Sequence, residues 1–171
     1  IDPIREDIVM SLETDIGLEG NLLGESPEDC KQLHLKSPIL SNAQLDFIKK
    51  LDRDGFRAAV VSTLFEADKG PAEMDRALHA ICKEAARCLE DGANMIILSD
   101  RGVSKKLAPI PSLMATGAVH QYLVHKHKRS ECGLIIETGE AREVMHFALL
   151  TGYGAGAVNP YLALETLDDL K

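Results

Sequence analysis

Several classes of protein are excluded by what the sequence lacks. It has no excess of basic residues, since 19 Lys and Arg stand against 27 Asp and Glu, which gives a formal charge of −8. Such a surface does not suit nucleic acid or an anionic membrane, because no surplus of cations is present to displace counterions. The apolar runs are far shorter than the roughly 20 residues that a membrane-spanning helix needs. We therefore expect neither a nucleic-acid partner nor a membrane partner.

The first residues also lack the marks of a secretory signal. "IDPIRED" (1–7) has no initiator Met, no basic region and no apolar stretch. We therefore expect a cytoplasmic protein and a segment of a longer chain.

Motifs for metal or nucleophilic chemistry are absent as well. No CxxC pair occurs, and no Cys/His spacing suits zinc or an iron–sulfur cluster, so we interpret the four cysteines as reduced packing residues: Cys30, Cys82, Cys88 and Cys132. "GYGAGA" (152–157) follows a predicted helix and precedes a strand, which is typical of a helix end and not of a phosphate loop. There is no GxSxG or HExxH motif.

Regular alternation of short apolar runs and longer helical patterns begins at residue 57. This alternation is typical of βα units around a parallel sheet, and the fold class that it predicts is α/β. The predicted strands are 57–65, 94–98, 132–138 and 154–160, and the predicted helices are about 70–92, 111–126 and 140–152. The third helix presents five apolar residues on one side: Ala141, Val144, Met145, Ala148 and Leu149.

The series could belong to a barrel or to an open doubly wound sheet. A full (β/α)₈ barrel needs about 250 residues, so we favour a truncated or half-barrel-like unit, related to the TIM barrel. We expect one fragment over 1–171, in which 56–171 is the βα-repeat core and 1–55 is an irregular wrapping segment. Within 1–55, the patterns predict a loop over 15–23, short helices over 26–33 and 41–51, and an extended stretch over 33–40.

The best candidate site lies where the predicted strands end. Because the carboxyl ends of parallel strands meet at one edge of a sheet, this edge should collect Glu66, Asp100, Arg101, Glu137 and Asn159. A carboxylate, a guanidinium and an amide together could hold an anion or polarise a substrate. Alternatively, these side chains pair with one another and "SDRGVS" (99–104) is a structural corner, because structural ion-pair networks imitate sites of this kind.

Long blocks of the sequence resemble the large chain of glutamate synthases, in the later part of its central domain. The blocks that carry the resemblance are "IDPIREDIVMSLE" (1–13), "GNLL" (20–23), "LKSPIL" (35–40), "DGANMIILSDRGVS" (91–104), "APIPSLMATGAVHQYL" (108–123) and "ETGEAREVMHFALLTGYGAGAVNPYLALETL" (137–167).

The resemblance implies a part of an enzyme that makes glutamate from glutamine and 2-oxoglutarate. In that family, ammonia released in an amidotransferase domain travels through a tunnel to a flavin site. The catalytic cysteine, the FMN site, the iron–sulfur cysteines and the use of NAD(P)H or ferredoxin belong to other segments. The resemblance therefore implies that the fragment itself has no catalytic residue and no cofactor.

Two functions follow as alternatives. The first is a non-catalytic connecting domain that couples the two sites and helps to shape the ammonia path. Its partners would be the amidotransferase and FMN domains of the same chain, and the isolated fragment could associate with itself. The second is an α/β module that binds an anion, a flavin phosphate or an effector at Asp100, Arg101, Glu137 and Asn159.

Overall fold

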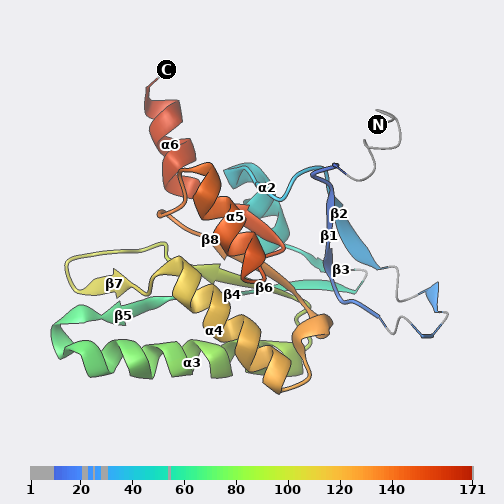
Figure 1. Cartoon of the computed structure of the whole chain (residues 1–171), viewed down its shortest axis with the longest axis horizontal. Coiled ribbons are helices and arrows are strands. Elements are labelled where there is room, and N and C mark those ends of the chain that lie inside the picture. The colour runs from blue at the N-terminus through green and yellow to red at the C-terminus, as the bar shows by residue number, and fades with distance from the viewer. Residues whose placement is uncertain (1–9, 21–22, 25, 28–30, 54, 171) are drawn as a thin grey trace.

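The computed structural model describes residues 10–20, 23–24, 26–27, 31–53 and 55–170 (Figure 1). Cys30 and part of the helix predicted over 26–33 lie outside these residues. In the described part of the chain, no helix is long and apolar enough to cross a membrane.

A five-stranded sheet forms the centre of the molecule. Its order is β3 (Asp52–Arg53), β4 (Phe56–Ser62), β6 (Met95–Ser99), β8 (Gly133–Glu137) and β9 (Ala157–Asn159). The last four strands are parallel, and β3 is antiparallel to β4. The α/β fold with a parallel sheet is therefore confirmed. The strands follow one another in chain order, as neighbouring strands of a barrel do, but the described strands form an open sheet with β3 and β9 at its two ends.

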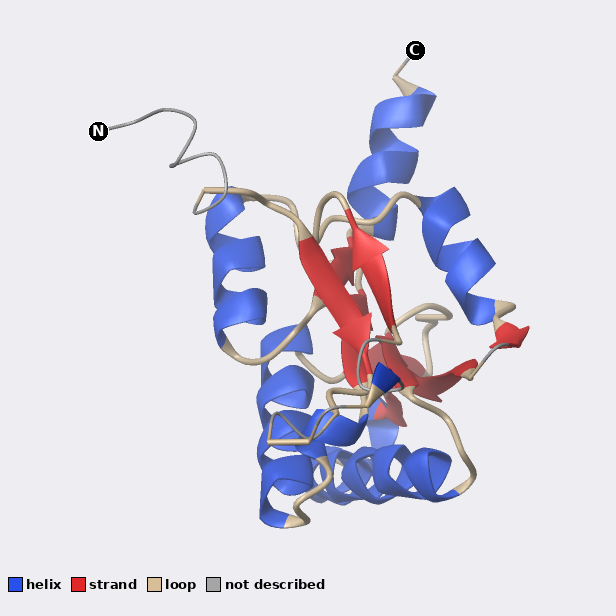
Figure 2. Cartoon of the chain, turned by 90° about the vertical axis from the view of Figure 1, so that its right-hand side faces the viewer, coloured by secondary structure: helices blue, strands red, loops and turns tan. Residues whose placement is uncertain are grey.

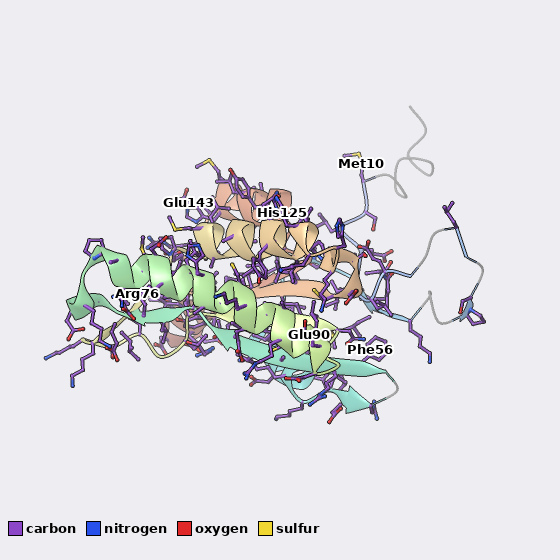
Figure 3. All side chains as sticks on the ribbon, turned by 90° about the horizontal axis from the view of Figure 1, so that it is seen from below. Met10, Phe56, Arg76, Glu90, His125 and Glu143 are labelled. Carbon is purple, nitrogen blue, oxygen red and sulfur yellow. The ribbon has the colours of Figure 1, made fainter. Side chains whose placement is uncertain are left out.

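Helices cover one face of the sheet. After β4 comes α3 (Pro71–Glu90), after β6 comes α4 (Ser112–His125), and after β8 comes α5 (Val144–Gly152). Their apolar sides enclose alternate strand residues such as Ile96, Leu98 and Leu134. Helices α3 and α4 lie side by side beneath this face (Figure 3). The short helices η2 (Ala67–Lys69) and η3 (Arg129–Glu131) complete the connections.

The N-terminal part of the described chain covers the other face. A hairpin of β1 (Thr14–Gly17) and β2 (Gln32–Leu35) and the helix α2 (Asn42–Lys49) contribute Ile16, Leu45 and Ile48 to a second apolar cluster. These side chains enclose the remaining strand residues, including Met95, Ile97 and Ile135. With both faces covered, β6 and β8 are buried along their whole length, which explains their continuous apolar runs. Figure 2 shows the sheet between these layers.

Two predictions for strands were wrong in part. A loop was predicted over 15–23, but its first residues belong to β1, which is a strand because it pairs with β2. The single strand predicted over 57–65 is divided: β4 ends at Ser62, and β5 (Leu64–Glu66) leaves the main sheet to pair with β7 (Leu107–Pro109). The division could not be predicted from residues 57–65 alone, because it depends on β7, which lies in the loop after β6.

The third predicted helix begins later than expected, at Val144. The preceding residue, Glu143, forms a capping box with His146. Glu140 lies in the loop before the helix, where its carboxylate accepts a hydrogen bond from the amide of Ser112 at the start of α4 (2.7 Å). Of the apolar residues on one side of the predicted helix, Ala141 is buried, whereas Val144, Met145, Ala148 and Leu149 are exposed.

A final helix, α6 (Tyr161–Asp169), follows β9 and has no fully buried residue. It projects from the body of the molecule toward the C-terminus in both views (Figures 1 and 2). The sequence patterns predict no helix after residue 160, so α6 was missed. The helix is attached through its first turns, at the same edge where the polar side chains of the sheet gather.

Candidate functional site

Four polar side chains form a row across the carboxyl edge of the sheet. The strand register places Ser62 beside Ser99, Ser99 beside Glu137, and Glu137 beside Asn159. Neighbours in a parallel register point to the same face, so the row continues the surface that α2 covers. Ser99, Glu137 and Asn159 are all buried.

Glu137 is the centre of the row. Its side chain is only 2% exposed, and Lys49 at the end of α2 donates to both carboxylate oxygens (2.8 and 2.9 Å). Ser99 Oγ donates to the second oxygen (2.6 Å), and Arg101 Nε donates to the first (2.7 Å). Burial alone would raise the pKa of Glu137, but the hydrogen bonds from Lys49, Ser99 and Arg101 lower it below its ordinary value. Glu137 is therefore a carboxylate held in its charged form.

Arg101 connects the sheet to α6. While its Nε contacts Glu137, its terminal nitrogen donates to Glu165 (2.8 Å), and its guanidinium lies 4.0 Å from the centre of the Tyr161 ring. An arginine can make these contacts at once because its donors form a planar fork that also stacks on aromatic faces. Arg101 is 40% exposed.

Asp100 points away from this row and stabilises the next loop. Its carboxylate accepts from the Thr138 hydroxyl (2.6 Å) and from the amide of Gly139 (3.0 Å). Burial, and after it the neighbouring Asp100 carboxylate, raise the pKa of the Tyr161 phenol, so this phenol stays protonated. Asp100 is thus a buried acceptor with its own donors, which fits a structural corner.

Asn159 joins the sheet to the N-terminal segment. Its Nδ2 donates to the carbonyl of Leu40 and to Oδ1 of Asn42, both at 2.9 Å. Among the described residues, its own Oδ1 has no hydrogen-bond partner although it is buried. A water molecule can donate a hydrogen bond to this oxygen. A phosphate does not suit the position, because phosphate oxygens accept hydrogen bonds and need donors from the protein.

Glu66 does not belong to this group. Because β4 ends at Ser62, Glu66 lies in the separate β5–β7 pair, where it forms a surface ion pair with Lys69. The other four predicted residues do lie at one edge. Two partners were missed: Lys49, which is 88 residues from Glu137 in the chain, and Glu165, on a helix that the patterns did not predict.

The charges in this group cancel. Lys49 and Arg101 supply two positive charges, and Glu137 and Glu165 supply two negative ones, each within 2.9 Å of a partner. The Ser99 hydroxyl contacts these ion pairs directly, but it donates to a carboxylate that is already held by two cations. That carboxylate is a poor general base, because its lowered pKa opposes taking up a proton.

The nearest pocket lies beside this group. It has a volume of about 540 Å³ and opens between the start of α4, the loop after β8, α5 and α6. Leu113, Leu149, Leu150 and Leu162 line it together with Arg142 and His146. None of the four candidate residues is part of its lining.

Comparison with known proteins gives a consistent result. The family model described as the glutamate synthase central domain matches residues 1–171. Similar proteins include "Glutamate synthase [NADH]" of Schizosaccharomyces pombe (44% identical, 99% of this chain, 8% of the relative) and "Glutamate synthase [NADPH] large chain" of Bacillus subtilis (40%, 97% and 11%). A third is "Ferredoxin-dependent glutamate synthase" of Pyropia yezoensis (39%, 97% and 11%). The chain thus spans about a tenth of the length of these relatives.

Proposed function

The chain belongs to the glutamate synthase central domain family, and from this membership we propose that it is a non-catalytic connecting domain within a longer polypeptide. In this role it couples an amidotransferase domain to an FMN-binding domain and helps to shape the path of ammonia between them. Its location in this proposal is the cytoplasm, although some relatives are named as chloroplastic enzymes.

One observation carries the proposal: the charged side chains at the edge of the sheet form ion pairs with one another. Both cations are paired with carboxylates, so their charges are already balanced and a substrate anion would have to compete with Glu137 and Glu165. The group joins three parts of the chain that are distant in sequence, because Lys49 comes from α2, Glu137 from β8 and Glu165 from α6. A group of this kind fixes geometry between elements, which is what a connecting domain requires.

The alternative is a ligand-binding module that holds an anion or a flavin phosphate at Asp100, Arg101, Glu137 and Asn159. Partial exposure of Arg101 favours it. Two observations stand against it: Arg101 already contacts two carboxylates, and the buried acceptor oxygen of Asn159 has no donor among the residues that the structure describes.

A titration separates the two functions. The chain is titrated with FMN, 2-oxoglutarate and glutamine in a calorimeter, and the connecting role predicts no saturable binding up to about 1 mM, a dissociation constant worth only about 4 kcal/mol. Saturable binding of FMN or 2-oxoglutarate that is lost in Arg101→Ala and kept in Arg142→Ala would support the ligand-binding module. Arg142 is the matched control because it lies in the neighbouring pocket, outside the polar group.

A further inference from the structure

Helix α5 is apolar on nearly all sides. Its nine residues, "VMHFALLTG", contain no Asp, Glu, Lys or Arg. A helix with this composition is normally buried all round. In this chain, however, only Leu150 is fully buried, and Phe147 packs partly against the core. The structure therefore leaves most of an apolar helix in contact with solvent.

The exposed side of α5 is a continuous row. Val144 is 86% exposed, Met145 63% and Leu149 41%, with exposed Ala148 between them. The outer side of α3 is different, since it carries charged residues, of which Arg76 and Glu90 are labelled in Figure 3. An exposed apolar row of this kind is typical of a surface that contacts another part of a protein.

The row leads into the pocket described above. Leu149 belongs to both, and Leu162 of α6, half exposed, forms the opposite wall. The pocket therefore extends the apolar row into a groove that can receive side chains from a partner. Grooves with apolar floors and a few polar groups at the margin are typical of docking sites for a helix or a loop.

Arg142 supplies the polar group at the margin of this groove. Its guanidinium has no ion pair or hydrogen bond among the residues that the structure describes, whereas its backbone amide donates to His146 Nδ1. An arginine without a partner beside an apolar groove favours a carboxylate on the docking surface.

Family membership points to the source of that surface. Relatives that match almost the whole chain are roughly ten times longer, so other domains are joined covalently to this one. Covalent connection keeps a partner at millimolar effective concentration, and even a modest apolar contact is then occupied most of the time.

We propose that the α5 row (Val144, Met145, Ala148 and Leu149) and its groove form the docking site for another part of the same long polypeptide, which presents apolar side chains and a carboxylate to Arg142. The proposal rests on the connecting role and names the surface through which this domain would contact another part of the polypeptide. It does not depend on the Arg101 group, so either can fail alone.

Thiol labelling in the full-length polypeptide tests the docking site. Met145→Cys is compared with Arg76→Cys, whose parent side chain has a similar exposure of 69% but lies on the charged side of α3. Labelling by N-ethylmaleimide is followed by mass spectrometry of each peptide. The docking site predicts labelling of Met145→Cys at least about tenfold slower than that of Arg76→Cys, because the partner must first move away. Equal rates would overturn the proposal.

Photocrosslinking identifies the occupant. A benzophenone amino acid replaces Met145 in full-length chains, and ¹⁵N-labelled and unlabelled chains are mixed before irradiation. Crosslinks within single chains, to a peptide that contains Asp or Glu, are the expected result. Crosslinks that combine both isotopes would assign the surface to a second copy, and an absence of crosslinks would leave the row without an occupant; either result overturns the proposal.

Discussion

Glu137 shows how a buried carboxylate is stabilised at the end of a parallel strand. Removing it from water is costly, and the cost is offset only because three side chains donate to its two oxygens. Neutralising it would leave Lys49 and Arg101 without their shared partner. Both cations are partly exposed, which lets water replace some of the loss.

We therefore predict that Glu137→Gln lowers the free energy of unfolding by about 2–3 kcal/mol at pH 7, somewhat less than for a fully buried pair. The pKa of Glu137 is lower in the folded chain than its ordinary value of 4.5, so its contribution is complete above that value and is lost as the pH falls through the folded pKa. Urea unfolding between pH 7 and pH 3 measures both effects.

Glu165→Gln is the matched control. Glu165 contacts the same arginine, but its side chain is 45% exposed, so its loss should cost less than about 1 kcal/mol. Equal losses for the two variants, or a Glu137→Gln variant whose stability falls with pH as steeply as the parent, would contradict the assigned role of Glu137.

The helices of the repeat were the most predictable elements. The sequence places α3 and α4 within a few residues of their observed bounds, because their apolar periodicity and the Pro and Gly signals at their ends are local. The start of α5 lies at Val144 and not near Glu140, where the sequence pattern places it. The strands β1 and β7 were missed, and the division between β4 and β5 was not predicted, because these strands are defined by their partner strands and not by their own patterns.

The junction between α4 and α5 depends on a glycine. Gly154 follows the end of α5 with φ of 110°, and a β-carbon there would overlap the imidazole of His120 on α4. His120 cannot move freely, because Arg129 donates to its Nδ1 (3.0 Å) and to the carbonyl of Gly154 (2.7 Å). This arrangement makes the position intolerant of any side chain.

We predict that Gly154→Ala lowers the free energy of unfolding by about 2–4 kcal/mol, since backbone strain and overlap add. Gly152→Ala should be neutral or slightly stabilising, because Gly152 lies inside α5 with no atom near a new β-carbon. Thermal unfolding of the two variants distinguishes them, and a larger loss for Gly152→Ala would refute the account of this junction.

At the scale of the whole molecule, the sequence predicts where the candidate site lies but not all the residues that form it. Parallel strands of similar length bring Ser99, Glu137 and Asn159 to one edge, and the sequence shows each of them at a strand end. The charges that neutralise this edge come from Lys49 and Glu165, and no local pattern connects either residue to the sheet. Because those partners decide between a ligand site and a structural group, the sequence alone left both functions open.

The relatives of this chain are about ten times longer than the chain itself. The proposed connecting role assigns the function of the chain to the elements that it holds in place. In this chain, Arg101 joins Glu137 of the sheet to Glu165 of α6, the helix that projects from the body. If the chain has the connecting role, replacing Arg101 should disturb that role most directly.

The most direct measurement uses full-length enzyme that carries Arg101→Ala. Glutamate formation from glutamine is compared with formation from added ammonia, and glutaminase activity is measured in the same preparation. The account predicts that the glutamine-dependent rate falls at least about fivefold relative to the ammonia-dependent rate, as for a typical coupling energy, while glutaminase activity is retained. Unchanged rates, or an equal loss of both synthetic activities in a variant with normal thermal unfolding, would contradict it.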